Sequence, residues 1–219
     1  MRARVGKLNC FKREGENERD CVVLLHGFGA DAGDLAPLAD YLDPDGEKTF
    51  YFPDAPLEVP IGPGWTGRGW FPISVRDLEL GVDFTQMRPP GLDQSTALVS
   101  EMLFEINAER VVLGGFSQGA MVSMDVALAG PEDVNALILY SGSLLDEPGW
   151  SAKAAGLKGK RYIQSHGAQD TVLPFAVGQK LNDLLRRAGA EGTFLSFAGA
   201  HEIPAPVLNR TREFLKGLG

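Results

Sequence analysis

The chain has few cysteines and histidines and no long hydrophobic stretch. Its 219 residues include 2 cysteines and 3 histidines. Two cysteines are too few for a disulfide framework, which excludes the small disulfide-rich secreted class. We expect Cys10 and Cys21 to be buried free thiols, the alternative being a disulfide between neighbouring strands of an N-terminal hairpin. No apolar run approaches the roughly 20 residues of a membrane-spanning helix, and no apolar segment of a secretory signal follows the basic first residues. These absences predict a cytoplasmic protein with no integral membrane association.

Positive charge is also scarce. The formal net charge is −8, and most of the acidic excess lies in residues 21–152. Nucleic acids and anionic membrane surfaces attract basic proteins, so we expect neither as a partner. No group of His, Cys and Asp has the spacing of metal ligands, because His166 and Asp170 lie in a glycine-containing turn and not on a helix. We predict no metal site and no cofactor.

Strand-like and helix-like segments alternate from residue 21 to the end of the chain. Expected strands are Arg4–Phe11, Cys21–Leu25, Thr49–Phe52, Arg110–Leu113, Ala136–Tyr140, Arg161–Ser165 and Thr193–Phe197. Expected helices are Asp34–Leu42, Leu92–Ile106, Gln118–Ala129, Pro174–Arg187 and Pro204–Leu215. Several strands are continuous apolar runs, as in sheets covered on both faces. The pattern predicts one α/β domain over residues 1–219, with a mostly parallel twisted sheet and helices on both sides.

The segment 53–90 interrupts this alternation. It is rich in proline and glycine, which predicts a long irregular segment, and it also contains Trp65, Trp70 and Phe71. Long irregular segments inside a domain are usually functional or disordered, and the aromatic residues argue against disorder. We predict a small loop-built cap over the functional site, with Leu57, Trp65, Trp70 and Phe71 binding substrate. An ordered surface excursion with no role is the alternative.

The most informative motif is Gly-Phe-Ser-Gln-Gly at residues 115–119. It follows a strand-like run and precedes a helix-like one, which is the setting of a nucleophile elbow. In such an elbow a strained turn exposes a serine hydroxyl, and small flanking residues allow close packing. A tight turn that merely needs small residues would show the same spacing. The context favours Ser117 as the nucleophile of a serine hydrolase.

A serine hydroxyl needs a base to remove its proton, and the chain order of this architecture is nucleophile, acid, histidine. Of the three histidines, only His201 lies downstream of both Ser117 and a suitable acid. Asp170 follows a late strand by a short glycine turn and is the predicted acid. Asp146, after the preceding strand, is the alternative acid.

The oxyanion of an acyl-transfer reaction needs two hydrogen-bond donors. One is expected to be the backbone N–H of Gln118, directly after the nucleophile. The other is expected from the loop after the early strand, where we choose the N–H of Phe28. His26, two residues earlier, would then shape that loop and act neither as a base nor as a metal ligand.

The motifs together resemble the phospholipase/carboxylesterase family, which includes acyl-protein thioesterases and small bacterial carboxylesterases. The resemblance is carried, in order over residues 24–203, by Leu25-His-Gly-Phe-Gly-Ala-Asp31, Pro53-Asp-Ala-Pro56, Gly69-Trp-Phe71, Gly114-Gly-Phe-Ser-Gln-Gly-Ala120, His166-Gly with Asp170, and Gly199 with His201. It implies an α/β-hydrolase fold without metal or cofactor, a triad at Ser117, Asp170 and His201, and oxyanion donors at Phe28 and Gln118. The loop around Ala30–Asp34 looks more like the bacterial carboxylesterases than the eukaryotic thioesterases, whereas Pro72, where members commonly have aspartate, and Gly199-Ala200 before His201 depart from the family pattern.

These observations predict a hydrolase that cleaves carboxylic esters of short to medium acyl chains through an acyl-serine intermediate. Small-molecule acyl esters are the expected partners, and the protein is expected to be a monomer or homodimer. A hydrolase of acyl thioesters, including those on proteins, or of lysophospholipids would use the same residues. A catalytically silent binding protein of the same fold is the alternative from a different class, although it would be expected to lack a site residue.

Overall fold

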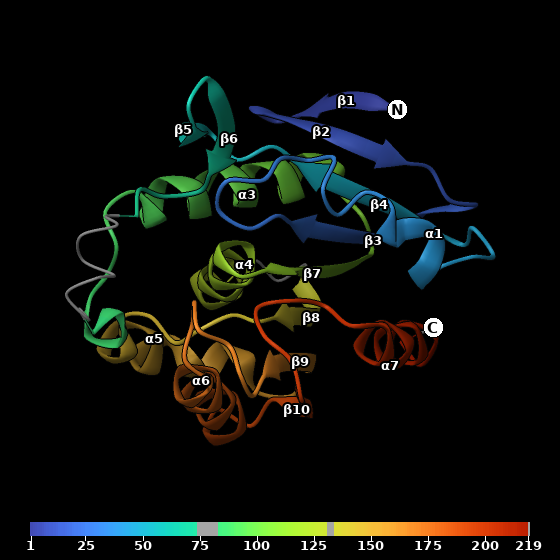
Figure 1. The fold of residues 1–219 in the computed structure, drawn as a ribbon. Coiled ribbons are helices and arrows are strands. Elements are labelled where there is room, and N and C mark those ends of the chain that lie inside the picture. The colour runs from blue at the N-terminus through green and yellow to red at the C-terminus, as the bar shows by residue number, and fades with distance from the viewer. Residues whose placement is uncertain (74–82, 131–133, 219) are drawn as a thin grey trace.

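An eight-stranded sheet runs through the centre of the protein in the computed structural model, which describes residues 1–73, 83–130 and 134–218 (Figure 1). Its strands are β1 (Arg2–Val5), β2 (Leu8–Arg13), β3 (Asn17–Leu25), β4 (Lys48–Pro53), β7 (Arg110–Phe116), β8 (Val134–Tyr140), β9 (Arg161–Gly167) and β10 (Glu191–Phe197). The helices are α1 (Leu38–Leu42), α3 (Leu92–Ile106), α4 (Gln118–Ala129), α5 (Glu147–Lys153), α6 (Phe175–Arg187) and α7 (Ala205–Lys216), with short 3₁₀ helices η1 (Phe84–Gln86) and η2 (Ala154–Leu157).

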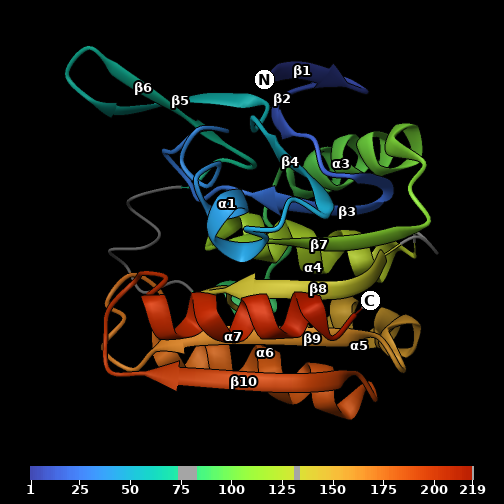
Figure 2. The ribbon, with the colours of Figure 1, turned by 90° about the vertical axis from the view of Figure 1, so that its right-hand side faces the viewer.

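The strand order is β1-β2-β4-β3-β7-β8-β9-β10 (Figure 2). The six strands from β4 to β10 run parallel, and the β1–β2 hairpin adds to β4 in the antiparallel direction. Parallel neighbours need crossover connections, and helices supply them. The predicted mostly parallel α/β sheet is confirmed.

Helices cover both faces of the sheet, α1 and α7 on one side and α3 to α6 on the other (Figure 1). Alternate residues of each central strand enter separate cores. In β3, Val23 and Leu25 belong to the larger core under α3 to α6, whereas Val22 and Leu24 belong to the core under α1 and α7. Because both faces are buried, these strands read in the sequence as continuous apolar runs.

The two cysteines lie on strands that are not neighbours. Cys10 is on β2 and Cys21 on β3, and β4 runs between them. The prediction that they lie on neighbouring strands of one hairpin is therefore wrong. The hairpin consists of β1 and β2, and β3 pairs with β4 and β7. Strands two apart are separated by about 10 Å, more than a disulfide spans. Both thiols are free and buried, and burial raises the pKa of Cys21 to about 12.

The segment 53–90 contains regular structure, contrary to the sequence expectation. β5 (Leu57–Gly62) and β6 (Trp65–Gly69) form a separate two-stranded antiparallel sheet. Pro60 fits because a two-stranded ribbon leaves one side of each strand unpaired, and the pairing register shifts beside it. Gly64 supplies the left-handed conformation of the turn, with φ of 76°. Residues 74–82 of the predicted cap lie outside the described residues.

One helix boundary and one additional helix also differ from the prediction. Residues 31–37 form turns, so the first helix starts at Leu38 and not at Asp34. Helix α5 at 147–153 was not predicted; it is capped by the side chain of Asp146, which accepts a hydrogen bond from Gly149 N–H. A seven-residue helix with Pro148 and Gly149 in its first turn carries too little periodicity to be predicted.

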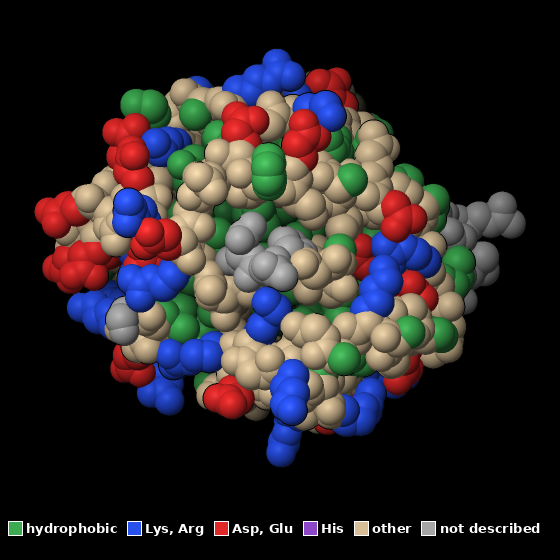
Figure 3. Space-filling view, turned by 180° about the vertical axis from the view of Figure 1, so that it is seen from behind, with side chains coloured by type: hydrophobic (Ala, Val, Ile, Leu, Met, Phe, Trp, Pro, Cys, Tyr) green, Lys and Arg blue, Asp and Glu red, His purple; other side chains and the backbone are tan. Residues whose placement is uncertain are grey.

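The carboxyl ends of the parallel strands face the viewer in Figure 1, and the opposite end is shown in Figure 3. On that opposite face basic and acidic side chains are interspersed and no histidine is visible. His26 directly follows β3, His166 is the penultimate residue of β9, and His201 follows β10. All three histidines therefore lie at the carboxyl ends of strands, where open α/β sheets gather functional groups.

Candidate active site

Ser117 occupies a strained turn between β7 and α4. Its backbone has φ of 55° and ψ of −117°, a conformation that L-residues rarely adopt. The turn is held by a hydrogen bond from Ser117 N–H to the Tyr140 carbonyl, at 2.8 Å. The Ser117 carbonyl accepts from the N–H groups of Ala120 and Met121. This is the strand–turn–helix geometry of a nucleophile elbow.

The glycines of the motif are required by close backbone packing. A Cβ at Gly119 would lie 2.0 Å from the carbonyl oxygen of Leu25, and one at Gly115 would lie 2.4 Å from the same atom. The end of β3 therefore runs directly against the start of α4. Any larger residue at either position would push the elbow away from the sheet.

Asp170 and His201 are brought together by two loops that share backbone hydrogen bonds. Gln169 N–H donates to Gly199 O at 2.9 Å, and a Cβ at Gly167 would lie 2.1 Å from Ala200 O. His201 Nδ1 lies 2.7 Å from Asp170 Oδ2. The Asp170 side chain is fully buried and that of His201 is 16% exposed, so the pair is shielded from water on the carboxylate side.

His201 also lies next to the elbow. Its ring packs against Phe116, the residue before Ser117, with centroids 4.7 Å apart. The loop of His201 is tied to the end of β8 by a bond from Ser141 Oγ to Glu202 O. His201, the expected base, and Ser117, the expected nucleophile, thus lie in adjacent loops.

Asp146 lies away from His201, in an ionic cluster around Arg88. The cluster joins Arg88 to Asp146 at 3.3 Å, to Asp93, and to Asp125 through two bonds of 2.8 and 2.9 Å. Burial raises the pKa of Asp125, but hydrogen bonds led by that of Arg88 outweigh it and hold the pKa below its usual range. Asp146 therefore caps α5 and binds Arg88, and its position does not support it as the alternative acid.

The expected oxyanion donors face no competing acceptor. Within the described residues, neither Phe28 N–H nor Gln118 N–H has a hydrogen-bond partner. Gln118 is the first residue of α4, where the backbone N–H groups of a helix are free and the dipole is positive. The Phe28 loop is fixed by β6, because Gly29 N–H donates to Arg68 O and Arg68 N–H donates to Ala30 O.

The side chain of Gln118 joins the elbow to the segment at 70–71. Its Oε1 accepts from Trp70 N–H at 2.8 Å, and its Nε2 donates to Phe71 O at 2.7 Å. Trp70 is 1% exposed, and its indole N–H donates to His26 O. His26 in turn accepts from Ala55 N–H through Nε2, and burial lowers its pKa. His26 and Trp70 therefore hold the site's loops together.

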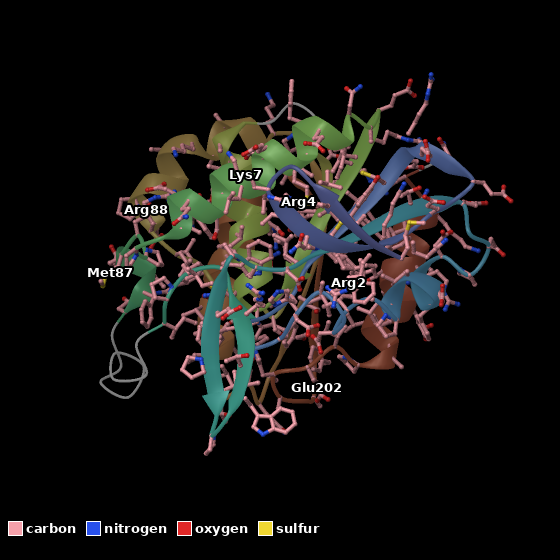
Figure 4. The ribbon with its side chains drawn as sticks, turned by 90° about the horizontal axis from the view of Figure 1, so that it is seen from above. Arg2, Arg4, Lys7, Met87, Arg88 and Glu202 are labelled. Atoms are coloured by element: carbon pink, nitrogen blue, oxygen red, sulfur yellow. The ribbon has the colours of Figure 1, made fainter. Side chains whose placement is uncertain are left out.

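Beside the elbow lies an apolar cavity of about 190 Å³. It is lined by Phe71, Pro72, Ile73, Phe84, Met87, Pro89, Pro90, Met121, Ser143, Leu145 and Leu173. Of the four expected substrate-binding residues, Phe71 is in this lining and the other three are not. Trp70 is in the core, Leu57 begins β5, and Trp65 is 72% exposed on the hairpin, which extends on the same side of the molecule as Glu202 (Figure 4).

Several residues of the cavity lining were not predicted from the sequence. Met121 lies four residues after Ser117 on α4, so it shares a helix face with the elbow, and this spacing was a usable signal. Leu173 lies three residues after Asp170 and is equally close in sequence to a predicted site residue. Phe84 lies in η1 and Met87 directly follows it. Neither is close in sequence to a predicted site residue, and only the fold brings them to the cavity.

Comparison with known proteins decides the family. The model of the phospholipase/carboxylesterase family matches residues 11–218. The chain belongs to this family. Acyl-protein thioesterase 1 of Emericella nidulans is 27% identical over 191 residues, 80% of each chain, and that of Saccharomyces cerevisiae is 29% identical, covering 74% of this chain and 75% of the relative.

Two solved structures have a similar fold. The crystal structure of esterase PE8 has a TM-score of 0.84 and 25% identity, covering 97% of this chain and 99% of the other. A carboxylesterase from Mesorhizobium loti has a TM-score of 0.75 and 25% identity, covering 96% and 94%. The protein is a hydrolase of the carboxylesterase and thioesterase type with the α/β-hydrolase fold.

The described residues contain no grouping of three or more His, Cys, Asp or Glu side chains arranged to hold a metal ion. In the same part of the chain, no helix has both the length and the apolar character needed to cross a membrane.

Proposed function

We propose that Ser117, His201 and Asp170 form the catalytic triad of a carboxylic-ester hydrolase. The observation that carries this proposal is the 2.7 Å contact of His201 Nδ1 with the buried Asp170 carboxylate, beside the strained turn of Ser117. Because Nδ1 donates to Asp170, Nε2 is left as the proton acceptor. This is the tautomer that a general base requires.

In the first half-reaction, Ser117 Oγ attacks the ester carbonyl carbon while His201 Nε2 takes the hydroxyl proton. The negative charge moves to the carbonyl oxygen, where the N–H groups of Phe28 and Gln118 are placed to donate to it. Collapse of this intermediate breaks the bond to the alkoxy oxygen, which leaves as alcohol after receiving the proton from His201. The acyl group stays on Ser117.

In the second half-reaction, water attacks the acyl carbon and gives its proton to His201. The same two N–H groups again face the oxyanion. Collapse releases the carboxylic acid and returns the proton to Ser117 Oγ. Asp170 stays ionised throughout and stabilises the imidazolium in both steps.

The apolar cavity is our candidate for the acyl-binding site. Three lining residues join the cavity to the proposed site. Phe71 accepts a hydrogen bond from the side chain of Gln118, Met121 lies on helix α4 after Ser117, and Leu173 lies in the turn after Asp170. An acyl chain that enters the cavity loses apolar contact with water, worth about 0.8 kcal/mol per methylene. We therefore assign the substrates as esters of short to medium acyl chains.

Hydrolysis of acyl thioesters is a second candidate, favoured by the acyl-protein thioesterases among the relatives. The triad and oxyanion donors would act identically on a thioester. Comparing kcat/KM for oxyesters and thioesters with the same acyl chain distinguishes the two.

The proposal is tested by Ser117→Ala. Ester hydrolysis and labelling by a fluorophosphonate probe are expected to disappear while the melting temperature stays within a few degrees. Ser123→Ala is the matched control, because Ser123 is buried on the same helix and donates to Gly119 O, away from the reaction. Labelling that persists in Ser117→Ala would contradict the proposal.

A further inference from the structure

A second imidazole touches the proposed catalytic acid from its buried side. His166 lies near the end of β9, four residues before Asp170, and is completely buried. Its Nε2 lies 3.4 Å from Asp170 Oδ2, the same oxygen that receives His201. The reaction described above makes no use of this residue.

The hydrogen-bond pattern defines the tautomer of His166. Nε2 lies 2.8 Å from the carbonyl oxygen of Leu173, which can only accept, so Nε2 carries the proton. Nδ1 is buried and has no partner among the described residues. A proton there would be a buried N–H without an acceptor, so the neutral ring with its proton on Nε2 is the favoured form.

This N–H donates to Leu173 O, so His166 Nε2 lies beside the Asp170 carboxylate without a hydrogen bond to it. Oδ1 accepts from Val172 N–H at 2.9 Å and from Leu173 N–H at 2.8 Å. Oδ2 accepts from His201 and lies 3.4 Å from His166 Nε2. Leu173 is therefore held twice, by its N–H to the carboxylate and by its carbonyl to His166, which closes the turn at 170–173.

The His166 ring has little freedom to move. A Cβ at Gly178 of α6 would lie 2.4 Å from His166 Nδ1, so glycine is needed there for the ring to fit. The ring of Phe175 meets it edge-on, with centroids 6.0 Å apart at 70°. The first residues of α6 thus hold the imidazole against the turn at residues 170–173.

We propose that His166 is a positioning residue that fixes the rotamer of Asp170 and keeps Oδ2 directed at His201. The inference rests on the proposed triad. His166 acts through Asp170 and has no contact with substrate. Its loss is expected to lower kcat and to leave KM nearly unchanged, because the binding surfaces are formed by other residues.

The test compares three variants in the hydrolysis of a nitrophenyl ester. His166→Leu keeps much of the volume but removes the donor to Leu173 O, and kcat is expected to fall by up to about 10-fold, the effect of losing a hydrogen bond that holds the turn whose N–H groups bind Asp170 Oδ1. His166→Gln keeps an N–H donor at similar reach and is expected to recover most of that loss. Ser165→Ala is the matched control, since the Ser165 hydroxyl is equally buried, lacks a partner among the described residues and points to the opposite face of β9.

A double-mutant cycle separates positioning from general support of the fold. In an Asp170→Asn background, His166→Leu is expected to cost less than twofold, because there is no carboxylate left to orient. A similar loss in both backgrounds, a loss that appears mainly in KM, or no rescue by Gln would overturn the inference. If the Leu variant does not fold, His166→Asn, which is polar but too short to reach Leu173 O, replaces it in the same cycle.

The outcomes also separate this inference from the proposed function. If Asp170→Asn alone leaves kcat unchanged, the assignment of the acid fails and the cycle has no meaning for His166. If Asp170→Asn is severely impaired and His166→Leu is not, the triad stands and the role of His166 is refuted.

Discussion

The acid–base loops and the wall of the apolar cavity are held in place by different kinds of interaction. Backbone hydrogen bonds join the loops of Asp170 and His201, and the carboxylate itself accepts from two backbone N–H groups. The wall at residues 84–90 has only the three-residue helix η1 of its own, and the Arg88 cluster ties it to the rest of the protein. In Figure 4, Met87 and Arg88 lie together at the edge of the molecule.

This difference has a consequence for tolerance to substitution. Geometry set by backbone groups survives most changes in surrounding side chains, because the donors and acceptors remain. Geometry set by a buried ion pair depends on both partners, and removal of one leaves an uncompensated charge. We therefore expect catalytic chemistry to resist substitution outside its own residues and His166, and acyl selectivity to be easily altered.

The largest expected effect is the loss of the acid. Asp170→Asn is expected to lower kcat by about 10⁴-fold, because the amide no longer holds His201 in the required tautomer. Asp146→Asn is the matched control and is expected to leave kcat within a few-fold, since Asp146 binds Arg88 and caps α5. Steady-state kinetics on one ester measure both variants, and the reverse ranking would contradict the assignment of the acid.

The second prediction concerns the anchor of the wall. Arg88→Met is expected to lower the free energy of unfolding by about 3–5 kcal/mol, because Asp125, 3% exposed, would be left as a buried unpaired charge. Activity on octanoyl esters is expected to fall more than activity on acetyl esters at a temperature where the variant is folded. Urea titrations and a chain-length series provide the two measurements.

Lys7→Met is the control for this variant. It breaks the pair with Glu101 on α3, whose side chains are 66% and 42% exposed, and exposed pairs contribute about 0–1 kcal/mol. Equal losses on acetyl and octanoyl esters in Arg88→Met would show that the cluster supports the fold without shaping the cavity.

A third prediction tests the cavity itself. Each methylene buried there is worth about 0.8 kcal/mol, close to fourfold in kcat/KM. Met121→Trp is expected to fill the cavity and flatten the rise of kcat/KM with chain length, with acetyl esters the least affected. Met124→Leu is the control, because Met124 is fully buried on the same helix but absent from the lining. An unchanged slope in Met121→Trp would place the acyl chain elsewhere.

The same contrast explains which features the sequence alone could predict. Chain order and position after a strand predicted His201 and Asp170, and two strand-to-loop junctions that lie close together in the fold bring these two side chains into contact. The parallel sheet followed from apolar runs that only burial on both faces produces. The part of the site that backbone hydrogen bonds hold in place is therefore also the part that sequence patterns predict.

Features that depend on side chains distant in sequence were not predictable in this way. Arg88 meets Asp125 and Asp146 from 37 and 58 residues away, and no local pattern links them. The β5–β6 hairpin was missed because Pro60 and the glycines argue against strands, whereas a two-stranded ribbon tolerates them. Trp70 was predicted to bind substrate, but its side chain is buried and its indole N–H donates to His26 O. Nothing in the sequence of this proline-rich segment indicates that hydrogen bond.

The smallest expected effect lies at the junction of the two regions, at His26. Burial lowers the pKa of His26 in the folded protein, whereas the unfolded chain has an ordinary value near about 6.5. As the pH falls through that ordinary value, the unfolded state binds a proton that the folded state does not, so stability decreases until the folded pKa is reached.

His26→Gln, which can still accept from Ala55 N–H, is expected to reduce the fall in melting temperature between about pH 7.5 and 5.5 and to leave the slope above pH 7.5 unchanged. An identical pH dependence in the variant and the parent would mean that other groups determine the acid sensitivity of the fold.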